Sequence, residues 1–183
     1  MSLESPEQDK LKEQQWQETF RSLDGIVDEL GMPIDARIKE TVAALKCTGF
    51  ETSGSCEGHL DRGVKAPWVD VSFLSEERRK LLREQITQSD REEDQRELRR
   101  NARMEMLAGV DRLTHFLDDF YRGKQTSFTS RLVLHFAPDS VRLCSQGAEV
   151  QDLFPTDQRL QKLEEFQKEM ASFTAFLKQN FFS

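Results

Sequence analysis

The chain has 183 residues, of which 26 are Lys or Arg and 33 are Asp or Glu, so its formal net charge is −7. Hydrophobic residues make up 37% of it, and this length and composition suit one domain with a single core. No run approaches the roughly 18 apolar residues that a membrane span needs, and no basic-then-apolar leader opens the sequence, so we expect no membrane contact.

The cysteines and the charge predict the compartment and bear on the partners. Cys47, Cys56 and Cys144 are an odd number of widely spaced thiols, which favours a reducing cytoplasm over a disulfide scaffold. Affinity for nucleic acid comes largely from basic side chains that neutralise phosphates. The acidic balance therefore weighs against a nucleic-acid binder, although a local basic patch is compatible with it.

The first predicted helix is defined by a cap and an apolar stripe. Ser5 is a candidate N-cap, and apolar side chains recur at intervals of three, four or five residues from Leu11 to Leu30. Gly31 then interrupts the pattern and predicts the end of the helix. Residues 1–10 are mostly polar, and we expect them to fray.

A second helix and two strands are predicted next. Asp35 is a natural N-cap for a helix that runs to about Lys46. Residues 50–53 are typical of a short strand, whereas 54–66 hold three glycines without periodicity, which indicates a loop. Across 68–73 polar and apolar residues alternate, the pattern of a half-buried strand.

A long helical region spans 75–122. Ser89 with Glu92 three residues later forms a capping box, which predicts a break near Gln88. Residues 87–97 form a charged stretch, and we expect it to be a solvated helical excursion supported by ion pairs at helical spacing. The alternative is an arm that binds RNA or a protein partner.

The last third predicts a hairpin followed by a helix. Residues 132–136 and 141–145 alternate around turn-forming residues at 137–140, and an apolar stripe begins at about Thr156. This stripe is rich in phenylalanine and is typical of a helix that packs on a core. Exposed phenylalanines at the end of this helix would favour a homodimer through it.

The predicted order is α-α-β-β-α(α)-β-β-α, within a single domain covering residues 1–183. Strands in two pairs, with helices grouped between them, indicate an α+β fold. We expect a small, mostly antiparallel four-stranded sheet covered by helices.

The candidate functional segment lies between the first two strands. It gathers hydroxyls, a thiol, an imidazole, carboxylates and a guanidinium, and its glycines let a ligand approach the backbone closely. If the next strand faces this segment, Trp68 would stack on a planar ligand and Asp70 would orient His59. The predicted ligand-binding residues are Thr52, Ser53, Ser55, Cys56, Gly58, His59, Asp61, Arg62, Trp68 and Asp70.

Four chemistries are compatible with this segment. In the first, successive backbone N–H groups around Gly54 and Gly58, with Ser53, Ser55 and the charge of Arg62, form a nest for an anion or nucleotide. In the second, Cys56 acts as a nucleophile with His59 as its base.

The other two chemistries give Cys56 and His59 different roles. They are three residues apart and are weak candidates for metal ligands, but zinc needs three or four ligands. The missing ones would have to be distant, so we expect no zinc; the distant candidates are Asp61, His115, His135 and Cys144. The fourth reading is structural, with a buried thiol and a hydrogen-bonded imidazole.

Two motifs between residues 33 and 73 carry a family resemblance. Ile34, Asp35 and Ile38 begin a helix, and a loop with the pattern T-x-x-S-C-x-G precedes a strand. This stretch resembles the N-terminal half of the wybutosine-synthesising tRNA methyltransferase family, and it is similar to uncharacterised bacterial and phage proteins with an S-C-x-G-H loop. The loop residues that match the family are Thr52, Ser55, Cys56 and Gly58.

The resemblance has functional implications and visible differences. It implies S-adenosylmethionine as cofactor, a tRNA base as substrate, and a pocket that includes the four matching residues. The family's loop has the pattern S-S-C-S-G-R, and in this chain Gly54, Glu57 and His59 stand at the first serine, the last serine and the arginine.

The leading functional expectation is a binding protein for a small polar or anionic, nucleotide-like ligand, held by the loop from Thr52 to Arg62. One alternative is an S-adenosylmethionine-dependent RNA methyltransferase-like enzyme. Another is a protein-interaction module that uses the long charged helix and the Phe-rich C-terminal helix.

Overall fold

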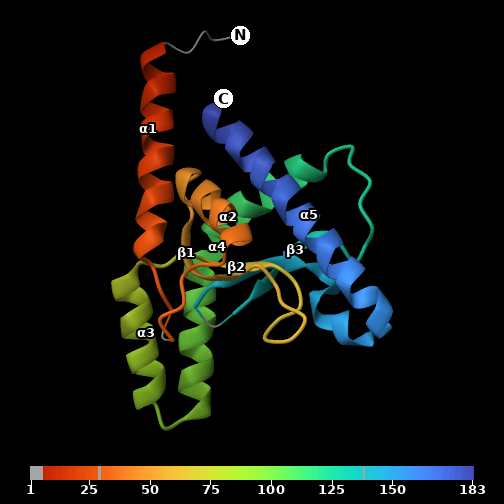
Figure 1. The fold of residues 1–183 in the computed structure, drawn as a ribbon. Coiled ribbons are helices and arrows are strands. Elements are labelled where there is room, and N and C mark those ends of the chain that lie inside the picture. Colours follow the sequence, from red (N-terminus) through yellow and green to blue (C-terminus); the bar gives the residue numbers. More distant parts are fainter. Residues whose placement is uncertain (1–5, 29, 138) are drawn as a thin grey trace.

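The computed structural model describes residues 6–28, 30–137 and 139–183 (Figure 1). The predicted cap at Ser5 and residue 138 of the predicted turn lie outside the described residues. The elements in chain order are α1 (Pro6–Ser22), the 3-10 turn η1 (Leu23–Gly25), α2 (Ala36–Cys47), β1 (Glu51–Cys56), β2 (Trp68–Ser72), α3 (Glu76–Gln88), α4 (Glu92–Tyr121), β3 (Leu132–Phe136), β4 (Val141–Ser145), the 3-10 segment η2 (Gln146–Leu153) and α5 (Thr156–Phe182).

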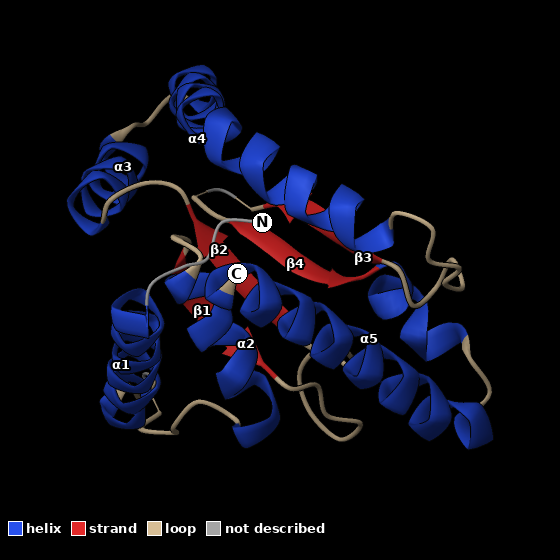
Figure 2. Ribbon diagram, turned by 90° about the horizontal axis from the view of Figure 1, so that it is seen from above, coloured by secondary structure: helices blue, strands red, loops and turns tan. Residues whose placement is uncertain are grey.

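The four strands form one antiparallel sheet in the order β1-β2-β4-β3. Val69 and Val71 of β2 pair with Leu143 and Val141 of β4, and all four side chains are fully buried. Helices α2 and α5 and the C-terminal part of α4 pack on this face (Figures 1 and 2). The chain therefore has the predicted α+β fold, a small sheet covered by helices.

The first helix is shorter than its apolar stripe predicts. It ends at Ser22, and the chain turns back at Asp28, whose carboxylate accepts hydrogen bonds from the backbone N–H of Leu30 and of Met32. In this turn the side chain binds backbone N–H groups that would donate to backbone carbonyls in a continuing helix. Leu30 is 86% exposed as a result, so the prediction of a helix up to Gly31 was wrong.

The first strand is longer than predicted. β1 continues to Cys56, and a bulge between Thr52 and Gly54 shifts its register with β2. A bulge admits glycine easily and bends the strand, which explains how a glycine-containing segment still pairs. Residues 54–56 are therefore strand, and the loop proper spans 57–67.

The predicted break in the long helical region is confirmed, but the capping box that predicted it does not form. The Ser89 hydroxyl donates to the carbonyl of Arg91, the residue that precedes α4, and caps no N–H group of the described chain. α3 begins after Ser75, whose hydroxyl accepts from the N–H of Arg78, and α4 begins at Glu92. The two helices lie side by side and project away from the sheet, with their connection at the far end (Figure 1). They share a small apolar cluster around Leu82 and Met106, and the charged stretch forms the tip of this projection.

The C-terminal phenylalanines pack within the chain. The ring of Phe182 lies 6.0 Å from that of Trp16 in α1, and Phe181 also packs on the main core. Because these phenylalanines pack within the chain, their exposure is no longer an argument for a homodimer. The homodimer stays a prediction. None of the described helices combines the length and the apolar character needed to cross a bilayer.

Candidate functional site

The loop after β1 brings a thiol and an imidazole together with a carboxylate. Cys56 ends β1, His59 follows in the loop, and Asp35 immediately precedes α2. One ligand-type atom from each lies within 4.8 Å of the others, and all three residues are half-buried. The Asp35 Oδ2 to His59 Nε2 distance is 3.3 Å. We call these three residues the Asp–Cys–His cluster.

An exchange of capping groups frees Asp35 for this cluster. An aspartate at an N-cap normally accepts from a backbone N–H in the first helical turn. Asp35 makes no such bond, because its Oδ2 accepts from the N–H of Glu57 at 3.0 Å. Glu57 in turn accepts from the N–H of Arg37 at 3.0 Å and thereby caps α2 from the loop. These reciprocal bonds fix the loop on the start of α2.

The cluster holds the acid charged and the thiol neutral. Burial acts to raise the pKa of Asp35, but the N–H of Glu57 and the imidazole of His59 outweigh it and hold that pKa below its ordinary value. Burial raises the pKa of the Cys56 thiol, and the charge of Asp35 raises it further against the opposing N–H of Gly58. Cys56 is thus a neutral thiol beside a carboxylate.

This arrangement does not support Cys56 as an activated nucleophile. A nucleophilic cysteine needs a lowered pKa and a base that accepts its proton. Among the described residues, the hydrogen bonds of the His59 imidazole run to Asp35 and Arg62, and none joins it to Cys56.

The backbone around Gly58 does not form the anion nest that the sequence suggests. The N–H of Gly58 donates to Cys56 Sγ at 3.3 Å, and the preceding N–H is bound by Asp35. Thr52 and Ser55 pair with core residues of β2, so their side chains share the helix-covered face. Ser53 and Asp61 are exposed. The backbone N–H groups of Glu57 and Gly58 therefore already donate to side chains of the protein.

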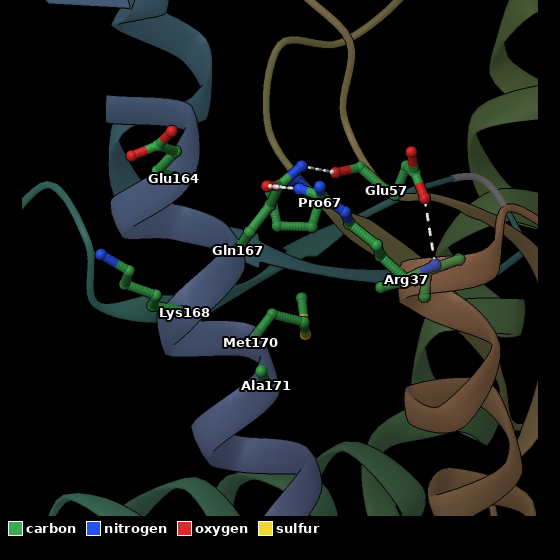
Figure 3. A pocket seen from close by; sticks show the side chains of 9 residues that line it. Arg37, Glu57, Pro67, Glu164, Gln167, Lys168, Met170 and Ala171 are labelled. Carbon is green, nitrogen blue, oxygen red and sulfur yellow. Dashed lines mark hydrogen bonds between the residues drawn. The ribbon is translucent and has the colours of Figure 1, made fainter. Parts of the chain in front are cut away.

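A pocket of about 410 Å³ lies beside the cluster, between α2, α5 and the loop. Figure 3 shows the Gln167 side chain joining its two walls. Gln167 accepts from the Arg37 guanidinium at 2.8 Å and donates to the Glu57 carbonyl at 3.0 Å. Met170 and Ala171 line the pocket beyond this bridge. Arg37, Glu57 and Gln167 are thus paired with one another.

Trp68 and Asp70 contact Arg142 and not the imidazole of His59 in the described structure. Asp70 makes two hydrogen bonds of 2.8 Å to Arg142 of β4, and the Arg142 guanidinium lies 3.9 Å from the centre of the Trp68 ring. The ring also covers Gly54, where an added Cβ would lie 3.3 Å from it. Asp35 and not Asp70 is thus the carboxylate that hydrogen-bonds His59. Arg142 covers a face of the Trp68 ring, where the sequence predicted a planar ligand.

A second pocket, of about 430 Å³, opens on this polar side of the sheet. The end of the loop, the β3–β4 hairpin and η2 form its walls. Two of its lining residues, His135 and Gln151, each carry a buried polar atom without a hydrogen-bond partner in the described structure, namely His135 Nε2 and Gln151 Oε1. Buried polar atoms are normally paired, so these two atoms in the pocket's lining residues have unmet hydrogen-bonding capacity. We call it the η2 pocket.

The charges of the η2 pocket are arranged in layers. Lys65 and Arg142 are 23% and 34% exposed, whereas the rim acids Asp152, which pairs with Lys65, and Glu149, which pairs with His135, are 70% and 71% exposed. Asp70, the partner of Arg142, is 17% exposed. The cations therefore lie deeper than the acids of the rim. Burial raises the pKa of the Cys144 thiol in the wall to about 11, so this thiol is neutral.

Comparisons with known proteins give no relative. No family model matches the chain, and neither the curated proteins nor the solved structures contain a significant match. The resemblance to the wybutosine-synthesising methyltransferases therefore stays a prediction.

Sequence reasoning missed three important residues. Asp35 was recognised as a helix cap, but nothing in its local pattern shows that its side chain faces the loop. Arg142 and Gln151 sit in a strand and a connecting segment without a motif. Only their pairing across the sheet, or their burial, identifies them.

Proposed function

We propose that the protein binds a small polar ligand of the nucleotide class in the η2 pocket. The observation that carries this proposal is the pair of buried, unpartnered atoms, His135 Nε2 and Gln151 Oε1. An unpaired buried polar atom costs about 1–3 kcal/mol, so a ligand that pairs with both recovers a substantial free energy.

The hydrogen-bonding roles of these atoms define the ligand's chemistry. Gln151 Nε2 donates to the carbonyl of Arg159 at 3.0 Å, which fixes Oε1 as an acceptor. His135 Nδ1 lies 3.5 Å from the carboxylate of Glu149, and a proton held there leaves Nε2 as a second acceptor. Two acceptors favour a ligand with paired donors, such as the exocyclic amino group of adenine, guanine or cytosine.

The cations of the pocket favour an anionic group on the same ligand. Lys65 and Arg142 lie deeper than the acidic rim, so a phosphate entering beside them would compete with Asp152 and Asp70. The pocket volume of about 430 Å³ also falls within the range of small-ligand sites. These features support an amino-bearing nucleoside monophosphate.

Calorimetry and thermal unfolding with defined probes test the proposal. We expect AMP, CMP and GMP to bind and to raise the unfolding temperature more than UMP or inorganic phosphate does. His135→Ala should weaken this binding. His115→Ala is the matched control, because His115 is an exposed residue of α4 paired with Asp111 and should leave binding unchanged.

Two results would count against the proposal. One is the absence of stabilisation by all four nucleotides, and the other is equal binding by the His135→Ala protein. S-adenosylmethionine is a separate probe. If it binds, and Cys56→Ala abolishes that binding while His135→Ala does not, the methyltransferase alternative gains support instead.

A further inference from the structure

We propose that Asp35, Cys56 and His59 form a binding site for a divalent transition-metal ion of the zinc class. The three side chains come from three segments that the loop brings together, the start of α2, the end of β1 and the loop itself. They offer one carboxylate oxygen, one sulfur and one imidazole nitrogen within 4.8 Å of one another. This site is separate from the η2 pocket and does not rest on the proposed nucleotide binding.

The spacing suits tetrahedral coordination. With zinc–ligand bonds of about 2.0–2.3 Å, ligand atoms of a tetrahedron lie about 3.3–3.8 Å apart. Asp35 Oδ2 and His59 Nε2 are already 3.3 Å apart. The sulfur of Cys56 lies within 4.8 Å of both and needs to approach by at most about 1.5 Å, which side-chain rotation supplies. Three protein ligands leave a fourth position open, as in zinc sites that hold water or a substrate.

Backbone groups orient two of the three ligands. The N–H of Glu57 donates to Asp35, and the N–H of Gly58 donates to Cys56 Sγ. Outer partners of this kind fix the direction of ligand lone pairs and are a general feature of metal sites.

The donor set selects the class of metal. Calcium and magnesium prefer oxygen ligands throughout, whereas a thiolate with an imidazole suits zinc, cobalt and related ions. A cation here would stabilise the negative charge of Asp35 and of a Cys56 thiolate, whose proton passes to the buffer on coordination. The surroundings thus complement a positive ion.

One positive group competes with the metal. The Arg62 guanidinium lies 3.3 Å from His59 Nε2, the nitrogen that would ligate, and the Arg62 side chain is exposed. It must move outward when the ion enters. We therefore expect Arg62→Ala to tighten metal binding.

Cobalt and zinc titrations of the full chain test the site. We expect one Co²⁺ per chain, with a thiolate charge-transfer band that Zn²⁺ abolishes by displacement. Cys56→Ser should remove the band. Asp35→Asn and His59→Ala should each weaken binding by more than the roughly 10–100-fold that loss of an outer partner costs. Cys144→Ser and Asp61→Asn are controls that should leave binding unchanged.

A second measurement avoids variants that fail to fold. Zn²⁺ should protect Cys56 of the wild-type protein from alkylation, read by mass spectrometry, while Cys47 and Cys144 keep the same labelling with and without the ion. The proposal is overturned if Zn²⁺ gives Cys56 no protection. It is equally overturned if the cobalt band persists in Cys56→Ser. Neither outcome affects nucleotide binding in the η2 pocket.

Discussion

Gly58 makes the loop geometry possible, and its replacement by alanine tests that geometry. Gly58 has φ +82°, and a Cβ there would lie 2.6 Å from the Ala66 carbonyl carbon and 2.9 Å from the nitrogen of Pro67. The substitution therefore introduces both backbone strain and a collision with backbone atoms. Gly63 is a matched control, because it has φ +58° but no heavy atom within 4 Å of an added Cβ.

The two substitutions separate strain from collision. A left-handed conformation costs an L-residue about 1–2 kcal/mol, and this is the whole cost that we expect for Gly63→Ala. Overpacking adds about 1–3 kcal/mol, so we expect Gly58→Ala to lower the free energy of unfolding by about 2–5 kcal/mol. At about 2–4 °C per kcal/mol for a chain of this size, the difference between the variants is measurable by thermal unfolding.

Urea denaturation followed by tryptophan fluorescence supplies the free energies. We expect a larger loss for Gly58→Ala than for Gly63→Ala, with unchanged slopes in denaturant. Equal losses for the two variants would refute the close packing of the loop on residues 66 and 67. A smaller loss for Gly58→Ala would contradict it more strongly.

Three further predictions concern the fold and the capping of the loop. Burial raises the pKa of Tyr121, the only tyrosine of the chain, well above its ordinary value of 10. The folded hydroxyl then keeps its proton at pH values where the unfolded one loses it. This group therefore leaves the free energy of unfolding unchanged below about pH 10 and lowers it as the pH rises above that value. Spectrophotometric titration should show tyrosinate forming near pH 10 in denaturant and only at higher pH in the folded protein; a single titration near 10 in both would contradict this. Alanine in place of a helical glycine normally stabilises by about 0.5–1 kcal/mol, but a Cβ at Gly109 would lie 2.0 Å from the Phe73 ring. We therefore expect Gly109→Ala to destabilise the protein in thermal melts, and a raised melting temperature would show that α4 and Phe73 are farther apart. Glu57→Ala removes the carboxylate that caps α2 at Arg37, and we expect a loss of about 0.5–2 kcal/mol in urea denaturation, whereas no loss would mean that the cap is absent.

The sequence predicts the order of elements because periodicity and capping are local. The alternation in β2 and the Ser75 cap of α3 depend on neighbouring residues alone. The cap is confirmed, and the alternation is confirmed from Trp68 to Val71, whereas Ser72, a polar position of the pattern, is buried. The end of α1 depends on a competing turn. Apolar residues continue beyond Ser22 at helical spacing. The backbone N–H groups of Leu30 and Met32 nevertheless donate to the Asp28 carboxylate and not to helical carbonyls.

The candidate site is only partly predictable because its completing residues are distant in sequence. Cys56 at the end of β1 and His59 in the loop that follows are near in sequence and were expected to lie close together. Asp35 reaches them only because Glu57 replaces it as the cap of α2, an exchange between residues more than twenty positions apart. Similarly, the unmet polar atoms of His135 and Gln151 become visible only when β3 and η2 close a pocket.

A nuclear magnetic resonance titration of the labelled protein with AMP tests the central functional proposal most directly. If the ligand enters the η2 pocket, the backbone amides of Val64, Lys65, Ala148 and Glu149, which line it, should shift together and saturate. The absence of any shift, or shifts confined to residues 57–59 beside the Asp–Cys–His cluster, would contradict the assignment of this pocket as the ligand site.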